Sequence, residues 1–205
     1  MTVFVVGGPS GVGKSTVVRA WRKASPDLRY IRTTATRAPR PGEERLDDRY
    51  EFVSLAVFER SLAAGEFAQW AHPSKGRWYG TKRRFIEEVL ASDDDGVIDY
   101  SPEMFHNFRR QYPGQVTGIF LKPPSFECLV RQLKSRGTEQ GKSLARKIEM
   151  ARLDMEFVPG HDYCIVNDDV DRVVQALMSI RAVERLRLRP PTAAAEPARV
   201  MWRYY

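Results

Sequence analysis

Short apolar runs alternate with helix-like stretches along most of the chain. Thr2–Gly7 is a β-branched run that ends in a Gly-Gly-Pro turn, and Lys14–Arg22 follows with apolar residues at helical spacing. This order predicts a strand, a glycine-rich loop and a helix. Three later apolar runs are also predicted strands: Gly96–Tyr100, Gly118–Leu121 and Tyr163–Val166. Because helical stretches separate them, the pattern predicts an α/β fold in which helices flank a parallel sheet.

The segment Thr33–Arg49 interrupts this pattern. It is rich in Arg, Pro and Gly, and we expect it to form no regular core element. Tyr50–Val53 is predicted to be a strand, and Ser54–Leu62 a helix whose N-terminus is capped by Ser54. We therefore interpret residues 33–90 as an insertion into the core.

A second interruption lies in the C-terminal half of the chain. Ser125–Arg136 is amphipathic, Gly137–Gly141 breaks the pattern, and Ser143–Phe157 resumes as a helix dense in positive charge. Such a hinged pair is typical of a lid, here residues 136–157, and Val173–Arg189 is predicted to be the last helix. Residues 1–189 thus form one predicted domain, followed by a Pro- and Ala-rich tail at 190–205. The predicted core comprises residues 1–32, 91–135 and 158–189.

Composition narrows the classes of partner. A chain of 205 residues with 42% hydrophobic content can bury one substantial core. The net charge of +7 indicates an anionic partner, which a phosphorylated metabolite, a nucleic acid or a membrane surface would satisfy. No apolar run reaches 18 residues, and no nucleic-acid-binding motif is present, so we expect neither of the latter two. Cys128 and Cys164 lack metal-ligand spacing and are expected in the core, as in a protein of the reducing cytoplasm. We expect the protein to be a monomer or a homodimer.

The loop after the first strand carries the most specific motif. Gly8-Pro9-Ser10-Gly11-Val12-Gly13-Lys14-Ser15 matches G-x-x-x-x-G-K-[ST] between a predicted strand and a predicted helix. The glycines allow consecutive backbone N–H groups to point at the phosphates of ATP, and the helix dipole adds to their pull. We expect Lys14 to reach the β- and γ-phosphates, Ser15 to ligate Mg²⁺, and Thr16 to line the same wall.

With this loop in place, the segment Thr36-Arg37-Ala38-Pro39-Arg40-Pro41-Gly42-Glu43 resembles the T-R-x-P-R-x-G-E signature of guanylate kinases. The resemblance spans roughly Val3 to Arg187. Its other motifs follow in order: Tyr50-x-Phe52-Val53-Ser54, Gly65-Glu66-Phe67, Trp78-Tyr79-Gly80-Thr81, Arg136-Gly137-Thr138 and Val166-Asn167-Asp168-Asp169. It implies the P-loop nucleoside monophosphate kinase fold, with a monophosphate-binding insertion and a lid, and transfer of the γ-phosphate of ATP to GMP or dGMP.

The resemblance also implies a group of residues around the acceptor phosphate. Arg37 and Arg40 stand on a Pro-containing loop, and their planar guanidinium groups suit bidentate contact with a phosphate in a way that lysine does not. Tyr50 and Tyr79 match the tyrosines whose hydroxyls donate to the same phosphate.

Further residues match the base site, the lid and the ATP site. Thr33 and Thr81 are implied near the acceptor base, and Asn167 at the ATP site. Arg136 matches a lid position that offsets charge on the transferring phosphoryl group, and so does one of the neighbours Arg146 and Lys147. Asp99 ends a predicted strand, either as an acid near Mg²⁺ or for structural reasons alone.

Two positions depart from the pattern. Gln69 and Ser101 stand where the family carries the carboxylates that read guanine. Guanine presents adjacent donors, which a carboxylate accepts, whereas an amide offers one acceptor and one donor. Three interpretations follow: guanine is read by a rearranged amide, another or a modified base is bound, or no base is bound.

The last interpretation corresponds to ribose 1,5-bisphosphate kinases, which resemble guanylate kinases and also lack this carboxylate pair. A small sugar phosphate is therefore the alternative acceptor. A third class, the guanylate-kinase-like modules that bind phosphopeptides, usually has an eroded phosphate loop. The intact Gly13-Lys14-Ser15 of this chain favours an enzyme over such a module.

Overall fold

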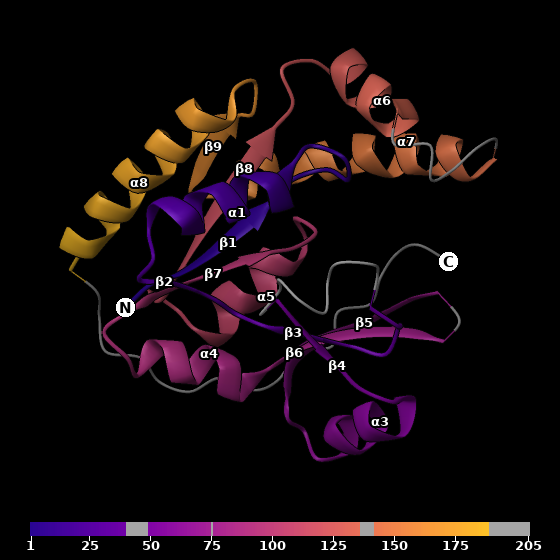
Figure 1. The fold of residues 1–205 in the computed structure, drawn as a ribbon, viewed down its shortest axis with the longest axis vertical. Coiled ribbons are helices and arrows are strands. Elements are labelled where there is room, and N and C mark those ends of the chain that lie inside the picture. The colour runs from indigo at the N-terminus through magenta and orange to yellow at the C-terminus, as the bar shows by residue number, and fades with distance from the viewer. Residues whose placement is uncertain (40–48, 75, 136–141, 189–205) are drawn as a thin grey trace.

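The computed structural model describes residues 1–39, 49–74, 76–135 and 142–188. Its larger sheet has five parallel strands in the order β2-β7-β1-β8-β9 (Figure 1). The strands are β1 (Val3–Gly7), β2 (Leu28–Tyr30), β7 (Asp95–Asp99), β8 (Val116–Lys122) and β9 (Tyr163–Val166). The predicted parallel sheet is thus present, and β2 is the strand that the apolar pattern did not reveal.

Alternation along β1 divides the core into two layers. Phe4 and Val6 pack with the cluster under α1 (Lys14–Ala24) and α8 (Val170–Leu186). Val3 and Val5 pack with the cluster under α4 (Arg83–Leu90) and α5 (Met104–Gln111). Since successive strand residues point to opposite faces, one buried strand supports helices on both sides of the sheet (Figure 1).

Two more helices and a short 3₁₀ helix connect β8 to β9. They are α6 (Phe126–Ser135), α7 (Lys142–Asp154) and the 3₁₀ helix η1 (Met155–Gly160). Leu129 and Leu133 of α6 and Ala151 of α7 are buried in the same cluster as the residues of α1. The helices α6 and α7 therefore pack beside the N-terminal end of α1, where the glycine loop lies (Figure 1).

A smaller sheet is built from the insertion. Its strand order is β4-β3-β6-β5, and its strands are β3 (Thr33–Ala35), β4 (Tyr50–Phe52), β5 (Phe67–Ser74) and β6 (Arg77–Lys82). Helix α3 (Leu55–Ala63) begins where the Ser54 hydroxyl accepts a bond from the Val57 backbone N–H, as expected. One face of this sheet packs on α3 through Phe58, Phe67 and Trp78.

The expectation that Thr33–Arg49 has no regular element is wrong at its start. Thr33–Ala35 is a buried strand, because it pairs with β4 on one side and β6 on the other. Three residues carry little propensity signal of their own, so the strand depends on partners far along the chain. Residues 40–48 of that segment lie outside the described residues.

Several predicted boundaries also differ. Helix α7 ends at Asp154 and continues only as 3₁₀ turns, and the last helix starts at Val170, because Asp169 caps it by accepting from the Arg172 backbone. Cys164 is exposed and Cys128 half-buried, because β9 is an edge strand and α6 faces solvent on one side. Helix α4 packs on the core sheet through Phe85, Ile86 and Val89, although the insertion was predicted to extend to residue 90.

The described helices include none that is both long and apolar enough to cross a bilayer.

Candidate active site

The glycine loop joins β1 to α1 at the carboxyl end of the core sheet. Gly8, Gly11 and Gly13 have positive φ values of 141°, 92° and 100°. A Cβ on Gly8 would lie 2.5 Å from the Leu121 carbonyl oxygen, and one on Gly13 would lie 2.7 Å from the Asn167 amide nitrogen. Both positions require glycine for backbone conformation, and Gly8 also requires it for space, because the atom it would meet belongs to the backbone. Inside the loop, Lys14 Nζ donates to the carbonyl oxygens of Gly8 (2.6 Å) and Pro9 (3.1 Å).

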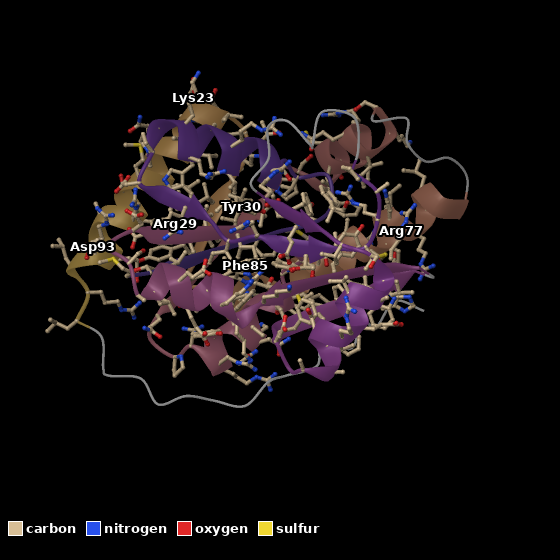
Figure 2. All side chains as sticks on the ribbon, turned by 60° about the horizontal axis from the view of Figure 1, so that its bottom comes forward. Lys23, Arg29, Tyr30, Arg77, Phe85 and Asp93 are labelled. Carbon is tan, nitrogen blue, oxygen red and sulfur yellow. The ribbon has the colours of Figure 1, made fainter. Side chains whose placement is uncertain are left out.

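A carboxylate meets the first turn of α1 at the end of the neighbouring strand. Asp99, the last residue of β7, accepts from Ser15 Oγ at 2.8 Å and from the Tyr30 hydroxyl. Figure 2 shows Tyr30 near the middle of the view, whereas Lys23 and Asp93 lie at its edge. Burial, followed by the Asp99 charge, raises the pKa of Tyr30 well above its ordinary value, so the phenol stays protonated and donates to the carboxylate.

Two residues brace the loop from behind. Asn167 Nδ2 donates to the Val12 carbonyl at 2.7 Å, while its own backbone N–H bonds to Lys122 at the end of β8. Asp154, the last residue of α7, is buried and accepts from the Ser10 backbone. Sequence reasoning missed Asp154, because an acid at the end of a charged helix looks like a solvated one until the fold places it against the loop.

Asp154 leads to a prediction about pH. Burial raises the pKa of Asp154 from 3.8 to about 6, against the opposing effects of Lys14 and the Ser10 backbone. The folded protein therefore binds this proton more tightly than the unfolded chain does, and its free energy of unfolding should fall as the pH rises from about 4 to 6. Asp154→Asn should raise that free energy by about 1–3 kcal/mol at pH 8.

Denaturant titrations at pH 4.5 and pH 8 would measure this effect. The gain from Asp154→Asn should be small at the lower pH, where the carboxyl is already protonated, and Glu156→Gln, at an exposed site two residues on, serves as the control. An equal gain at both pH values would contradict a buried, ionising carboxyl.

A row of side chains crosses the smaller sheet on the face away from α3. Tyr50 pairs with Thr33 in the parallel ladder of β4 and β3, and Gln69 pairs with Thr81 in the antiparallel ladder of β5 and β6. Because Thr34 pairs with Gly80, Thr33 stands opposite Thr81 and links the two ladders. Paired residues point to the same face, so four residues from four strands line one surface. Tyr79, two residues before Thr81, shares it.

Arg37 lies over the β4 end of this row. Its guanidinium carbon is 4.8 Å from the centre of the Tyr50 ring and 5.2 Å from that of Phe52. Burial, then the Asp99 charge, raises the pKa of Tyr50, while Arg37 opposes the shift. A cation and a neutral phenol that can both donate hydrogen bonds therefore stand together at the β4 end of the row, which suits the binding of an anion.

The other end of the row is neutral and buried. Thr81 Oγ1 lies 2.9 Å from the Tyr100 hydroxyl, and burial raises the pKa of Tyr100 to about 12, so this phenol remains uncharged. Gln69 is fully buried, and Ser101 follows Tyr100 with a buried hydroxyl oxygen. Sequence reasoning did not select Tyr30 or Tyr100, although the ends of neighbouring parallel strands converge and could have suggested them.

The cationic residues predicted for the lid are described only in part. Lys147 is half-buried on α7 and shares a helical stripe with the buried Ala151 and Asp154, whereas Arg146 is exposed. The predicted roles of Arg136 and of the acceptor-site Arg40 fall on positions outside the described residues.

The chain is similar to known proteins in both sequence and fold. A family model described as guanylate kinase matches residues 1–183. The guanylate kinase of Symbiobacterium thermophilum is 40% identical over 186 residues, which cover 90% of this chain and 86% of that protein. The guanylate kinase of Corynebacterium jeikeium is 40% identical over 179 residues, which cover 87% and 94%. A crystal structure of guanylate kinase from Anaplasma phagocytophilum has the same fold, with a TM-score of 0.72 at 24% identity, over 91% of this chain and 87% of that one.

Proposed function

Because this chain belongs to the guanylate kinase family, we propose that it transfers the γ-phosphate of ATP to GMP, with dGMP as a related acceptor. The observation that carries this proposal is the spatial order of the site. The glycine loop with Lys14, the Asp99 carboxylate, Arg37 over Tyr50, and the row ending at Gln69 follow one another. This order matches a donor triphosphate, an acceptor phosphate and an acceptor base laid end to end. The relatives and the intact loop do not favour a sugar-phosphate kinase or a phosphopeptide-binding module.

The residues at the junction also suit Mg²⁺. Magnesium binds few protein oxygens and keeps phosphate and water as its other ligands. Ser15 Oγ and Asp99 Oδ2, 2.8 Å apart, offer an oxygen pair of this kind at the edge of the glycine loop. Bound there with ATP, the ion would offset the negative charge of the β- and γ-phosphates.

Transfer between two phosphates needs positioning and charge more than covalent chemistry. Lys14 would hold the β- and γ-phosphates, with the loop fixed in place by Asn167 and Asp154. Arg37 and Tyr50 would hold the acceptor phosphate in line with the transferred group, and Lys147 is better placed than Arg146 to approach it from α7. No general base is required, because the acceptor oxygen is already anionic.

ATP-dependent ADP release tests the function directly. The acceptors would be GMP, dGMP, AMP, CMP, UMP, dTMP and ribose 1,5-bisphosphate, with the Lys14→Ala protein as blank. We expect GMP or dGMP to be turned over well above the blank. A ribose 1,5-bisphosphate rate above that of every nucleotide would refute the nucleotide assignment, and silence with all acceptors would refute the enzyme itself.

Arg37→Lys tests the acceptor-phosphate site. The substitution keeps the charge but removes the planar fork and the ring contacts at 4.8 and 5.2 Å. We expect the KM for GMP to rise by about tenfold while the KM for ATP stays within about twofold. Arg32→Lys is the matched control, because Arg32 lies at the same 4.8 Å over Phe85, away from the row. Equal changes in both KM values would place Arg37 outside the acceptor site.

The proposal also covers the enzyme's partners, cellular location and oligomeric state. Its partners are small nucleotides. The positive net charge of +7 would attract the phosphates of these nucleotides rather than a nucleic acid or a membrane. We place it in the cytoplasm, where ATP and GMP are available, as a monomer or homodimer.

A further inference from the structure

The Gln69 side chain is the most conspicuous polar group of the site. It is 0% exposed, yet neither its amide nitrogen nor its amide oxygen has a hydrogen-bond partner among the described residues. Buried polar atoms in folded proteins are nearly always paired, so an amide with both atoms unmatched indicates a ligand that pairs with it. The Ser101 hydroxyl oxygen is buried and unmatched in the same way.

These two groups lie at the same end of the site. Gln111 of α5 donates to the Ala68 carbonyl at 2.8 Å, which fixes β5 beside Gln69 against that helix. Ala71, two residues on and on the same face as Gln69, packs with Met104 and Tyr100. Ser101 stands between Tyr100 and Met104, and its carbonyl accepts from the Met104 backbone. The unmatched amide and the unmatched hydroxyl are therefore carried by segments that pack on each other at the base end of the row.

The donor and acceptor of the Gln69 amide determine which hydrogen-bonding groups of a base can pair with it. A glutamine presents an acceptor beside a donor, so it pairs with a carbonyl next to an N–H. The O6 and N1–H atoms of a 6-oxopurine form this pair, and guanine and hypoxanthine share it. A carboxylate at position 69 would instead accept from two donors, N1–H and the C2 amine, of which hypoxanthine has only the first.

We propose that Gln69 makes this pocket a 6-oxopurine site that reads O6 and N1–H and does not select for the C2 amine. The inference rests on the proposed GMP kinase function and extends its acceptor class to the hypoxanthine nucleotide, IMP. Ser101 is consistent with this reading, because a hydroxyl can donate or accept and does not require an amine opposite it. A site built to bond a particular N–H rejects the analogue that lacks it far more strongly than a site with no such group.

The unaltered protein gives the first test. We expect kcat/KM for GMP and IMP, measured as ATP-dependent ADP release, to agree within about tenfold. A preference for GMP of about a hundredfold or more would overturn the inference. In that event Glu103→Gln would show whether the carboxylate two residues after Ser101 reads the amine instead. Absence of activity with GMP, relative to the Lys14→Ala blank, would refute the proposed function and is distinguishable from either result.

Two variants then examine the residues themselves. Ser101→Asp and Gln69→Glu each supply a carboxylate that can accept from the C2 amine, so each should raise the ratio of kcat/KM for GMP over IMP by about tenfold to a hundredfold. Ser179→Asp adds the same charge at an exposed site on α8 and should leave the ratio unchanged. Because a charge at the fully buried position 69 can impair folding, Ser101→Asp is the decisive variant, and thermal unfolding confirms its fold. An unchanged ratio in a folded Ser101→Asp protein would overturn the inference.

Discussion

Lys14→Ala should lower kcat for ATP-dependent phosphorylation of GMP by about a thousandfold or more. Lys14 starts α1 and lies inside the glycine loop, where its ammonium group donates to the carbonyl oxygens of Gly8 and Pro9. From this position the ammonium group can stay in contact with the γ-phosphoryl group while negative charge develops during transfer. Removal of Lys14 therefore destabilises the transition state more than the ground state. Steady-state kinetics at saturating ATP and GMP measure the loss.

The fold should survive this substitution. The two bonds to the loop carbonyl oxygens are lost, and each contributes about 1 kcal/mol, so the midpoint of thermal unfolding should fall by about 4–8 °C. Lys23→Ala is the control, because Lys23 is exposed near the other end of the same helix (Figure 2). A fully folded Lys14→Ala protein that retains a tenth or more of the activity would rule out a chemical role for this lysine.

The glycine loop was predictable because its motif dictates local backbone geometry. The positive φ values at Gly8, Gly11 and Gly13 and the helix starting at Lys14 follow a motif that lies within eight consecutive residues. The same holds for the Ser54 cap and for the apolar strands of the core. Features of this kind depend mainly on residues that are close together in the sequence.

The acceptor side was less predictable, because it depends on pairing between distant strands. Thr33 joins the row only because β3 lies between β4 and β6, and a strand of three residues is too short to be predicted from its own sequence. Asp154 likewise gains its role from the way the end of α7 meets Ser10. The different exposure of the adjacent cations Arg146 and Lys147 also required the fold, because two neighbouring basic residues on one helix look alike in sequence.

Asp95→Ala should cause the largest loss of stability. Asp95 begins β7 with 0% exposure and accepts from the Thr2 backbone at 3.0 Å, from Arg181 Nε at 2.8 Å and from Arg185 Nε at 2.7 Å. Removing it leaves the buried Arg181 with Asp27 as its remaining partner. We expect the free energy of unfolding at pH 7 to fall by about 3–5 kcal/mol, as for other buried ion pairs that lose one member.

The pH dependence of this loss follows from the pKa of Asp95. Burial alone would raise that pKa, but the bonds from Arg181, Arg185 and the Thr2 backbone lower it below 3.8. A carboxyl whose pKa is lower in the folded state stabilises the protein above its unfolded pKa, and this contribution disappears as the pH falls through the folded value. The difference in free energy of unfolding between the natural chain and Asp95→Ala should therefore be full at pH 7 and shrink below pH 4. Urea titrations at pH 7 and below pH 4 measure this difference.

Two further variants separate the ion pair from a general effect on this turn. Asp93→Ala removes an exposed carboxylate two residues earlier and should change the free energy of unfolding by less than about 0.5 kcal/mol. Adding Arg181→Met to Asp95→Ala should recover part of the loss, because it removes the buried cation that the first substitution left with too few partners. The double variant would then be more stable than the sum of the two single losses predicts. Strict additivity would mean that Asp95 and Arg181 act independently, and would contradict a coupled network that ties α8 to the start of β7.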